Sequence, residues 1–125
     1  SRELGVDEHA VIKTLIFEDE NRKPLVVLMH GDREVSGKQL ARFLGVKSLS
    51  PAKPEVAEKH SGYRVGGTSP FGLKKPLPIY AEKTIFDLPR IWINAGQRGL
   101  LVELKPALLD DLLKLEKVHV AQSGS

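Results

Sequence analysis

The sequence has 125 residues, the usual size of a single domain, with 41% hydrophobic and 28% charged residues, as in a soluble globular protein. The absence of cysteine excludes a disulfide framework and thiolate chemistry, and no apolar run approaches the roughly 18 residues of a membrane span. A net charge of +3 permits a phosphate-bearing partner but fits a lysine-rich solvated surface equally well. No charged-then-apolar leader opens the chain, so we expect a cytoplasmic protein.

Local patterns in the first half predict a hairpin followed by two short helices. β-branched and aromatic residues indicate the two strands of the hairpin. Ser36 can cap a helix that Gly45 ends, and Pro54 suits the first turn of another helix. The expected elements are the last turn of a helix at 2–6, strands at 11–18 and 24–29, and helices at 36–44 and 54–60.

The second half predicts short strands before a third helix. Pro76, Pro78 and Pro89 interrupt this part, and Pro106 opens the helix, whose leucines at 108, 109, 112 and 113 form one apolar stripe. Because strands and helices do not alternate regularly, we expect an α+β fold with a mixed sheet, in one domain over 1–122 with a tail at 123–125. The expected strands are 77–80, 84–86, 90–94, 99–104 and 117–121.

Lys13 is the first candidate functional residue. Both faces of the strand at 11–18 are apolar, as in a central strand, and Lys13 interrupts one of them. A buried ammonium is costly, so the side chain either reaches water at the rim of the sheet or lies in a cleft where it meets a phosphate or carbonyl oxygen. Both interpretations fit the periodicity.

The second candidate is the glycine-rich segment GYRVGGTSPFG at 62–72. Gly66 and Gly67 have neither the lysine of a Walker loop nor the spacing of a dinucleotide site. Paired glycines let the backbone approach a ligand closely, so that N–H and C=O groups recognise it. A tight connection between a helix and the next strand explains these glycines equally well.

The third candidate is NAGQRG at 94–99, between two expected strands. A hairpin turn is the simpler interpretation, and a second small-residue wall opposite the glycine segment is the alternative. Four further basic residues form either a solvated face or a rim for RNA phosphates: Lys47, Lys74, Lys75 and Arg98.

The remaining chemistry-bearing residues predict no other site. His9, His30, His60 and His119 show no metal-ligand spacing, so no metal is expected. Ser69 precedes a proline and has no identifiable base, so no catalytic triad is expected either.

Three motifs together resemble the YbaK/ProX family of aminoacyl-tRNA deacylases, which is related to the editing domain of bacterial prolyl-tRNA synthetase. They are the VIKTLIF strand, GYRVGGTSPFG followed by two lysines, and INAGQRGLLVEL, and the resemblance runs from Leu4 to about Val120. It implies an α+β fold, a mixed and strongly curved β-sheet with flanking helices. It also implies hydrolysis of the ester that joins a wrong amino acid to the terminal adenosine of tRNA, without a cofactor.

The resemblance also implies the roles of individual residues. Lys13 matches the lysine on which activity depends in the family, and Gly66 matches a glycine that offers backbone contacts at the scissile end. The segment that matches Asn94 lines the amino-acid pocket. With Lys13 and Gly66 as catalytic residues, the expected substrate-binding residues are Thr14, Gly67, Thr68, Ser69, Pro70, Asn94, Ala95 and Gly96.

The leading interpretation is a trans-acting editing hydrolase that binds the acceptor end of aminoacyl-tRNA, with an aminoacyl-tRNA synthetase as a further candidate partner. Cysteine, alanine, serine and threonine are the candidate amino acids. Family members carry a helix and a strand before the segment matching Leu4, so we expect a compact version or a chain that begins late. The alternatives are a non-catalytic tRNA- or synthetase-binding module of the same fold and an inactive structural domain.

Overall fold

The structure, a computed structural model, describes residues 7–63, 68–74, 76–96 and 100–123. The helix turn expected at 2–6 lies outside these residues. The strands are β1 (Val11–Asp19), β2 (Pro24–His30), β3 (Arg33–Val35), β4 (Leu49–Pro51), β5 (Ile79–Glu82), β6 (Ile91–Asn94), β7 (Leu101–Leu104), β8 (Leu115–Val118) and β9 (Ala121–Ser123). The helices are α1 (Gly37–Leu44), α2 (Pro54–Ser61) and α3 (Ala107–Leu112), with 3₁₀ turns η2 (Glu8–Ala10) and η3 (Lys83–Asp87). None of these helices is long and apolar enough to span a membrane.

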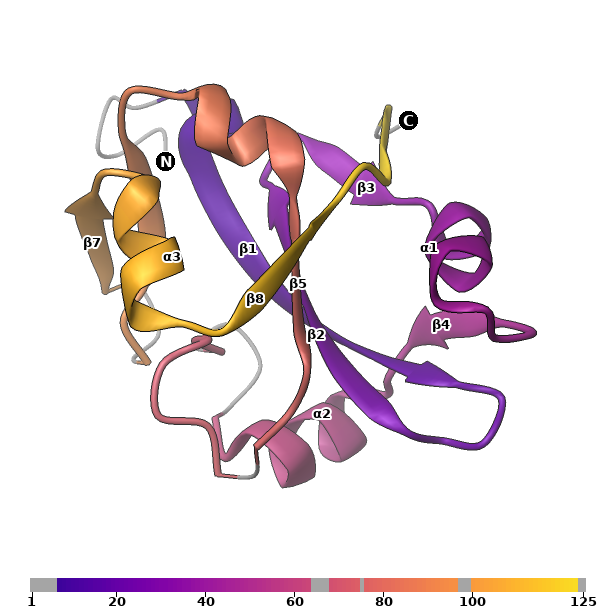
Figure 1. Cartoon of the computed structure of the whole chain (residues 1–125). Coiled ribbons are helices and arrows are strands. Elements are labelled where there is room, and N and C mark those ends of the chain that lie inside the picture. Colours follow the sequence, from indigo (N-terminus) through magenta and orange to yellow (C-terminus); the bar gives the residue numbers. More distant parts are fainter. Residues whose placement is uncertain (1–6, 64–67, 75, 97–99, 124–125) are drawn as a thin grey trace.

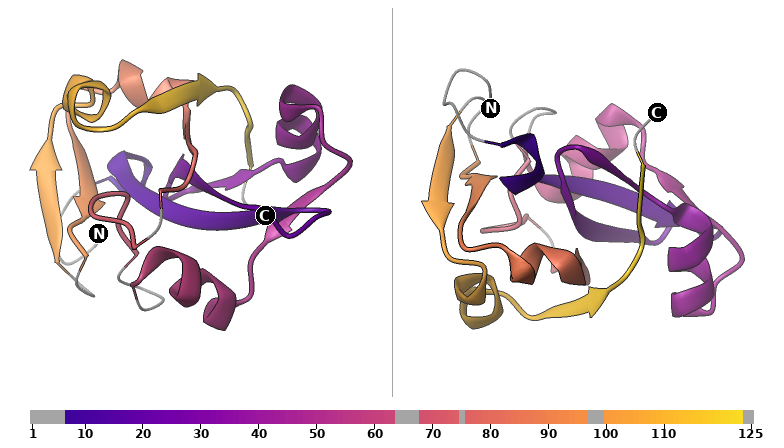
Figure 2. Two further views of the ribbon diagram at one scale, coloured as in Figure 1. Left: turned by 60° about the horizontal axis from the view of Figure 1, so that its bottom comes forward. Right: turned by 90° about the horizontal axis from the view of Figure 1, so that it is seen from above.

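The main sheet is mixed, as predicted. Its order is β7-β6-β1-β2-β5-β8, with β4 as a further partner of β1, while β3 and β9 form a separate two-stranded sheet. The β1–β2, β1–β4 and β6–β7 pairs are antiparallel, and the β1–β6, β2–β5 and β5–β8 pairs are parallel. Figures 1 and 2 show β1 as a bent ribbon through the middle, with the helices around it. The α+β fold and its curved sheet are confirmed.

β1 has two apolar faces because each faces its own core. Ile12 and Ile16 belong to a core with the buried side chains of β5 and β6, and Phe17 belongs to a second core with α1 and β4. This alternation is the pattern of a strand that is covered on both sides. Lys13 therefore starts from an apolar surface on the Phe17 side.

Both helices predicted in the first half of the chain form, and residues that cap helices mark their ends. The Ser36 hydroxyl accepts a hydrogen bond from Gln39 N at 3.2 Å, and Gly45 ends α1 in the left-handed region, with φ +72°. Gly62 ends α2 in the same way, with φ +82°. α1 buries Leu40 and Ala41 in the second core.

Three expectations in the second half are wrong. Residues 84–86 form part of the 3₁₀ turn η3 and no strand, because the Glu82 carboxylate accepts a hydrogen bond from Thr84 N and starts a turn there. The strand expected at 117–121 divides into β8 and β9, and Ser123, expected in the tail, ends β9 opposite Arg33.

The leucine stripe of the third helix is also only partly buried. α3 has six residues and holds only three of the four leucines, because Leu113 is its C-cap in an extended conformation. Leu109 is fully buried, whereas the side chains of Leu108 and Leu112 are 40% and 57% exposed.

Glu82 is a buried carboxylate that holds the crossing between the two sheets. Its Oε1 accepts hydrogen bonds from Val120 N and Ala121 N at 2.7 and 2.8 Å, and its Oε2 faces Thr84 and His119 Nδ1. Burial would raise the pKa of Glu82, but the hydrogen bonds from His119, Thr84 and Val120 outweigh burial and lower it. The carboxylate therefore stays ionised at neutral pH.

A buried histidine extends this polar network toward the N-terminal side of the described chain. His30 stacks on His9, with ring centroids 3.8 Å apart, and its two ring nitrogens lie 2.7 Å from His9 O and from Thr84 Oγ1. Because a carbonyl only accepts, Nδ1 of His30 carries a proton. Burial has the largest effect on the pKa of His30 and lowers it, so the imidazole is neutral in the folded protein.

We predict that Glu82→Gln lowers the free energy of unfolding by about 2–4 kcal/mol, because an amide NH₂ would replace an acceptor oxygen among buried donors. Urea unfolding at pH 7 measures this, with the exposed Glu116→Gln on β8 as a control expected to change the stability by less than about 0.5 kcal/mol. The folded-state pKa lies below its ordinary value of 4.5, so the difference should persist above that pH and shrink as the pH falls through the folded-state pKa. Equal midpoints for both variants would contradict the prediction.

Candidate active site

The edge of β1 that faces away from β2 is interrupted. β2 pairs with β1 from Ile12 to Glu18, but on the other edge β6 pairs only with Val11 and Ile12, and β4 only with the last three residues. Between these ladders Ala52 N donates to Ile16 O. In the described part of the chain, no strand pairs with residues 13–15 along this edge, which leaves a gap in the sheet.

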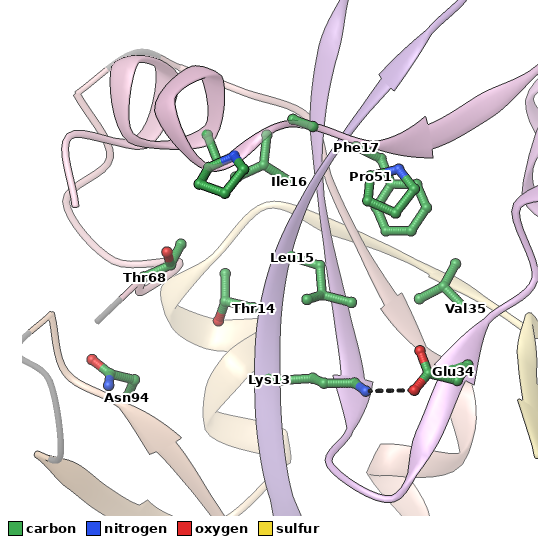
Figure 3. A pocket seen from close by; sticks show the side chains of 13 residues that line it. Lys13, Thr14, Leu15, Ile16, Phe17, Glu34, Val35, Pro51, Thr68 and Asn94 are labelled. Carbon is green, nitrogen blue, oxygen red and sulfur yellow. Dashed lines mark ion pairs between the residues drawn. The ribbon is translucent and has the colours of Figure 1, made fainter. Parts of the chain in front are cut away.

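A cavity of about 480 Å³ occupies this gap. Its walls are mostly apolar, and its polar side chains come from Lys13, Thr14, Glu34, Thr68 and Asn94. Figure 3 shows Thr14 pointing from β1 toward Thr68 and Asn94, while Lys13 points the opposite way, toward Glu34. The apolar walls come from Leu15, Ile16, Phe17, Val35, Pro51, Ala52, Pro54 and Ala57. A ligand that touches both groups of polar side chains must lie across the open edge of β1.

Lys13 is paired loosely within the cavity. Its Nζ lies 3.7 Å from Glu34 Oε1, and the two side chains are 29% and 59% exposed. An ion pair with this much exposure contributes at most about 1 kcal/mol. The carboxylate can therefore yield the ammonium to a ligand anion at little cost.

Thr14 lines the same cavity and carries a buried hydroxyl. Its Oγ1 has no hydrogen-bond partner among the described residues. A buried hydroxyl without a partner costs about 1–3 kcal/mol, so a folded protein rarely keeps one without a reason. A ligand carbonyl or hydroxyl in the cavity would satisfy it.

The structure brings together four of the predicted site residues and separates others. Lys13, Thr14, Thr68 and Asn94 line the cavity. Ser69 and Pro70 are buried, and the Ser69 hydroxyl accepts a hydrogen bond from Phe71 N at 3.2 Å in a local turn. Gly66 and Gly67 lie outside the described residues, so their predicted roles remain predictions.

The predicted residues of the 94–99 segment that the structure describes form a tight turn. Asn94 Oδ1 accepts a hydrogen bond from Gly96 N at 2.7 Å, and Ala95 N donates to Leu100 O at 3.1 Å. Ala95 is exposed and does not line the cavity. Gly96 has φ +100°, and a Cβ there would lie 2.8 Å from Cε1 of Tyr63.

Tyr63 links this turn to the glycine-rich segment. Its hydroxyl donates to Phe71 O, so the two aromatic residues near the ends of that segment close it. Ser61 Oγ accepts from Tyr63 N at 3.1 Å, and Lys74 N donates to Ser61 O at 3.0 Å. Gly96 thus makes room for the tyrosine ring that holds the segment carrying Thr68.

Glu34 and the apolar residues after β4 are cavity residues that the sequence did not indicate. β3 and β4 have three residues each, too few for a period-two pattern to stand out. The Pro-Ala-Lys-Pro run at 51–54 was the available signal, since prolines at an edge mark backbone that does not continue a ladder. Within the described residues, no three His, Asp or Glu side chains are arranged to hold a metal ion.

The sequence matches the family described as "Aminoacyl-tRNA editing domain" over residues 1–112. The chain belongs to this aminoacyl-tRNA editing domain family. The resemblance predicted from the three motifs is thereby confirmed at the level of the family.

Two curated relatives of this editing domain differ greatly in length. One, from Enterococcus faecalis, is named "Putative Cys-tRNA(Pro)/Cys-tRNA(Cys) deacylase EbsC" and is 33% identical over 103 residues, 82% of this chain and 63% of that protein. The other is a proline–tRNA ligase of Limosilactobacillus fermentum, 31% identical over 100 residues, 77% of this chain and 18% of the ligase. The chain thus spans less than two thirds of either protein.

Solved structures support the fold of the editing domain. A structure titled "Crystal structure of a putative trans-editing enzyme for prolyl tRNA synthetase" superposes with a TM-score of 0.88 at 24% identity, covering 98% of this chain and 76% of that one. At this identity the match concerns the fold alone.

We predict that Gly96→Ala destabilises the editing domain by about 2–3 kcal/mol, because the new Cβ would combine a left-handed backbone with a collision against Tyr63. Gly45→Ala is the matched control. Its φ is +72° and nothing lies within 4 Å of the added Cβ, so only the backbone cost of about 1–2 kcal/mol applies. Thermal unfolding measures both, and near-ultraviolet circular dichroism of the tyrosines should change only for Gly96→Ala. Identical losses would mean that the contact with Tyr63 is not tight.

Proposed function

We propose that this editing domain hydrolyses the ester bond of mischarged aminoacyl-tRNA, acting in trans on the acceptor end. The observation that carries the proposal is that Lys13 and Thr14 line one largely apolar cavity from opposite sides of β1, and that the Thr14 hydroxyl has no hydrogen-bond partner among the described residues. Family membership supports aminoacyl-tRNA as the substrate class, and the volume of about 480 Å³ lies within the usual range of small-molecule sites.

The substrate would lie across the open edge of β1. Lys13, beside β3, would hold the terminal adenosine through its phosphate or the amino-acid end, displacing Glu34. Thr14, Thr68 and Asn94 would surround the aminoacyl group on the other side of the strand. The apolar walls include Ala52 and Ala57 as well as the larger Ile16. A small amino acid such as cysteine, alanine, serine or threonine would fit among them.

The reaction requires water to add to the ester carbonyl, the carbon–oxygen bond to the ribose to break, and the ribose oxygen to take up a proton. Among the described lining residues no histidine stands beside Thr14 or Thr68 to activate a hydroxyl as a nucleophile. The rate would therefore come from positioning and from stabilising the developing oxyanion. Backbone groups of residues 66–69 would fix the ester carbonyl, while a ribose hydroxyl of the substrate or a backbone carbonyl orients the water.

We predict that Thr14→Val slows deacylation about tenfold without lowering the stability of the protein. The valine keeps the shape of threonine but removes a hydroxyl that has no hydrogen-bond partner among the described residues. Single-turnover hydrolysis and urea unfolding test the two parts. Thr84→Val is the contrasting variant, because the Thr84 hydroxyl lies 3.0 Å from Glu82 Oε2 and its loss should cost stability. Loss of stability in Thr14→Val would show that its hydroxyl already serves the fold.

We predict that Lys13→Ala reduces deacylation at least a hundredfold while tRNA affinity changes by less than about threefold. The assay presents proline tRNA charged with alanine, cysteine or serine, and other tRNAs charged with serine or threonine. Lys23→Ala, an exposed lysine in the β1–β2 turn, is the control and should retain full activity.

The same assay distinguishes the alternative function. Salt-sensitive tRNA binding by the wild-type protein, with no hydrolysis of any substrate in the panel, would favour a non-catalytic tRNA-binding module. Unchanged hydrolysis by Lys13→Ala would refute the catalytic role of that lysine.

A further inference from the structure

We propose that a basic groove between α1 and β4 binds the sugar-phosphate backbone of the acceptor strand just before its terminal nucleotide. The inference rests on the proposed editing function and adds a second contact surface to it. The groove has a volume of about 350 Å³, and Lys38, Arg42 and Lys47 are among the residues that line it. Figure 1 shows α1 beside β4, at the side of the molecule away from β7 and α3.

The residues that line the groove carry a net positive charge. All three basic residues are exposed, and none forms an ion pair with another described residue. Lys38 and Arg42 are four residues apart on α1 and share one face of the helix. Three cations around one concave surface attract a polyanion and repel one another when nothing is bound.

Helix stability does not account for all of these cations. Arg42 lies in the last turn of α1, where the helix dipole favours a positive charge. Lys38 lies in the first turn, where the dipole opposes it, and no acidic residue accompanies it there. Its position is therefore unfavourable for the helix and favourable for an anion in the groove.

The backbone of the groove wall is held in place. The exposed Glu20 carboxylate lies against the loop before β4, where its Oε1 accepts from Lys47 N at 3.2 Å and lies 3.5 Å from Ser48 N. Gly37 packs so closely on β4 that a Cβ would lie 2.7 Å from Leu49 O. The cations therefore project from a rigid frame, which reduces the entropy lost on binding.

The groove lies next to the candidate active site, on the side of Lys13. Val35 lines the cavity, and Gly37, two residues later in the chain, lines the groove. On β4, Pro51 lines the cavity and Leu49 lines the groove. Two residues of a strand span roughly 7 Å. An RNA strand whose last nucleotide contacts Lys13 would thus continue past these residues into the groove.

The basic rim expected from the sequence differs from this groove. Lys47 belongs to the groove, whereas Lys74 lies beyond the glycine-rich segment, where its Cβ comes within 2.9 Å of a Cβ added at Gly62. Lys75 and Arg98 lie outside the described residues. The three groove cations meet only in the folded chain, because Lys47 comes after the helix that carries the other two.

The test compares two triple variants. The groove variant carries Lys38→Ala, Arg42→Ala and Lys47→Ala, and the matched control carries Lys83→Ala, Lys105→Ala and Lys114→Ala. Both remove three exposed cations, so both change the net charge equally. The substrates are the mischarged tRNA identified by the panel and a single nucleotide, adenosine 5′-monophosphate carrying the same amino acid on its ribose. Urea unfolding confirms that both variants are folded.

For the groove variant we expect KM for tRNA to rise at least tenfold, kcat to change less than threefold, and the slope of log kcat/KM against log salt to flatten by about 2–3 units. The single nucleotide, which has no backbone to place in the groove, should lose less than threefold. Equal effects of the two variants would overturn the proposal, as would equal losses on tRNA and the single nucleotide.

Binding of uncharged tRNA, measured by fluorescence anisotropy, separates this inference from the proposed function. If the wild-type protein hydrolyses nothing, weaker tRNA binding by the groove variant alone still supports the groove. If the groove variant binds tRNA normally but loses binding to a proline–tRNA ligase, the groove serves an acidic protein surface and the RNA proposal is wrong.

Discussion

The arrangement of the sheet and of the cavity depends on which strands pair with the two edges of β1. One edge pairs with β2 without interruption, while the other is divided between a parallel partner, β6, and an antiparallel partner, β4. These two cannot meet on the same stretch of β1, so residues 13–15 stay open. Because both faces of β1 are covered by packed side chains and β2 pairs with its other edge, the open stretch is rigid even though no described strand pairs with it along this edge. The gap therefore presents Lys13 and Thr14 in fixed positions.

The cavity wall that β3 forms depends on a contact that lies outside the cavity. Glu34 and Val35 belong to β3, whose partner is β9, and the chain just before β9 is held by the buried Glu82 carboxylate. By accepting several hydrogen bonds, the Glu82 carboxylate takes the place of the strand pairing that would otherwise join β9 to the main sheet. Stability and site are thus linked, because losing Glu82 would release the wall that faces Lys13.

The sequence predicts those parts of the fold whose signal is local. β-branched and aromatic residues located β1 and β2, and Ser36 and Gly45 located α1, because caps and local composition act within a few residues. The strands β3, β4 and β9 have three residues each and exist only through their partners, so no local pattern indicates them. The same holds for the site: Lys13 was conspicuous on an apolar strand, whereas the missing neighbour of Thr14 and the approach of Glu34 arise from tertiary pairing alone.

The glycines illustrate why turn and pocket interpretations need not exclude each other. Gly96 is a turn residue by its backbone, yet its missing side chain is what lets the ring of Tyr63 approach. Tyr63 in turn closes the glycine-rich segment through Phe71, and Thr68 of that segment faces Thr14 across the cavity. The two loops therefore behave as one unit, in which a turn on β6–β7 determines where the opposite wall of the cavity stands. A small residue far from any ligand can thus be required for the shape of the site.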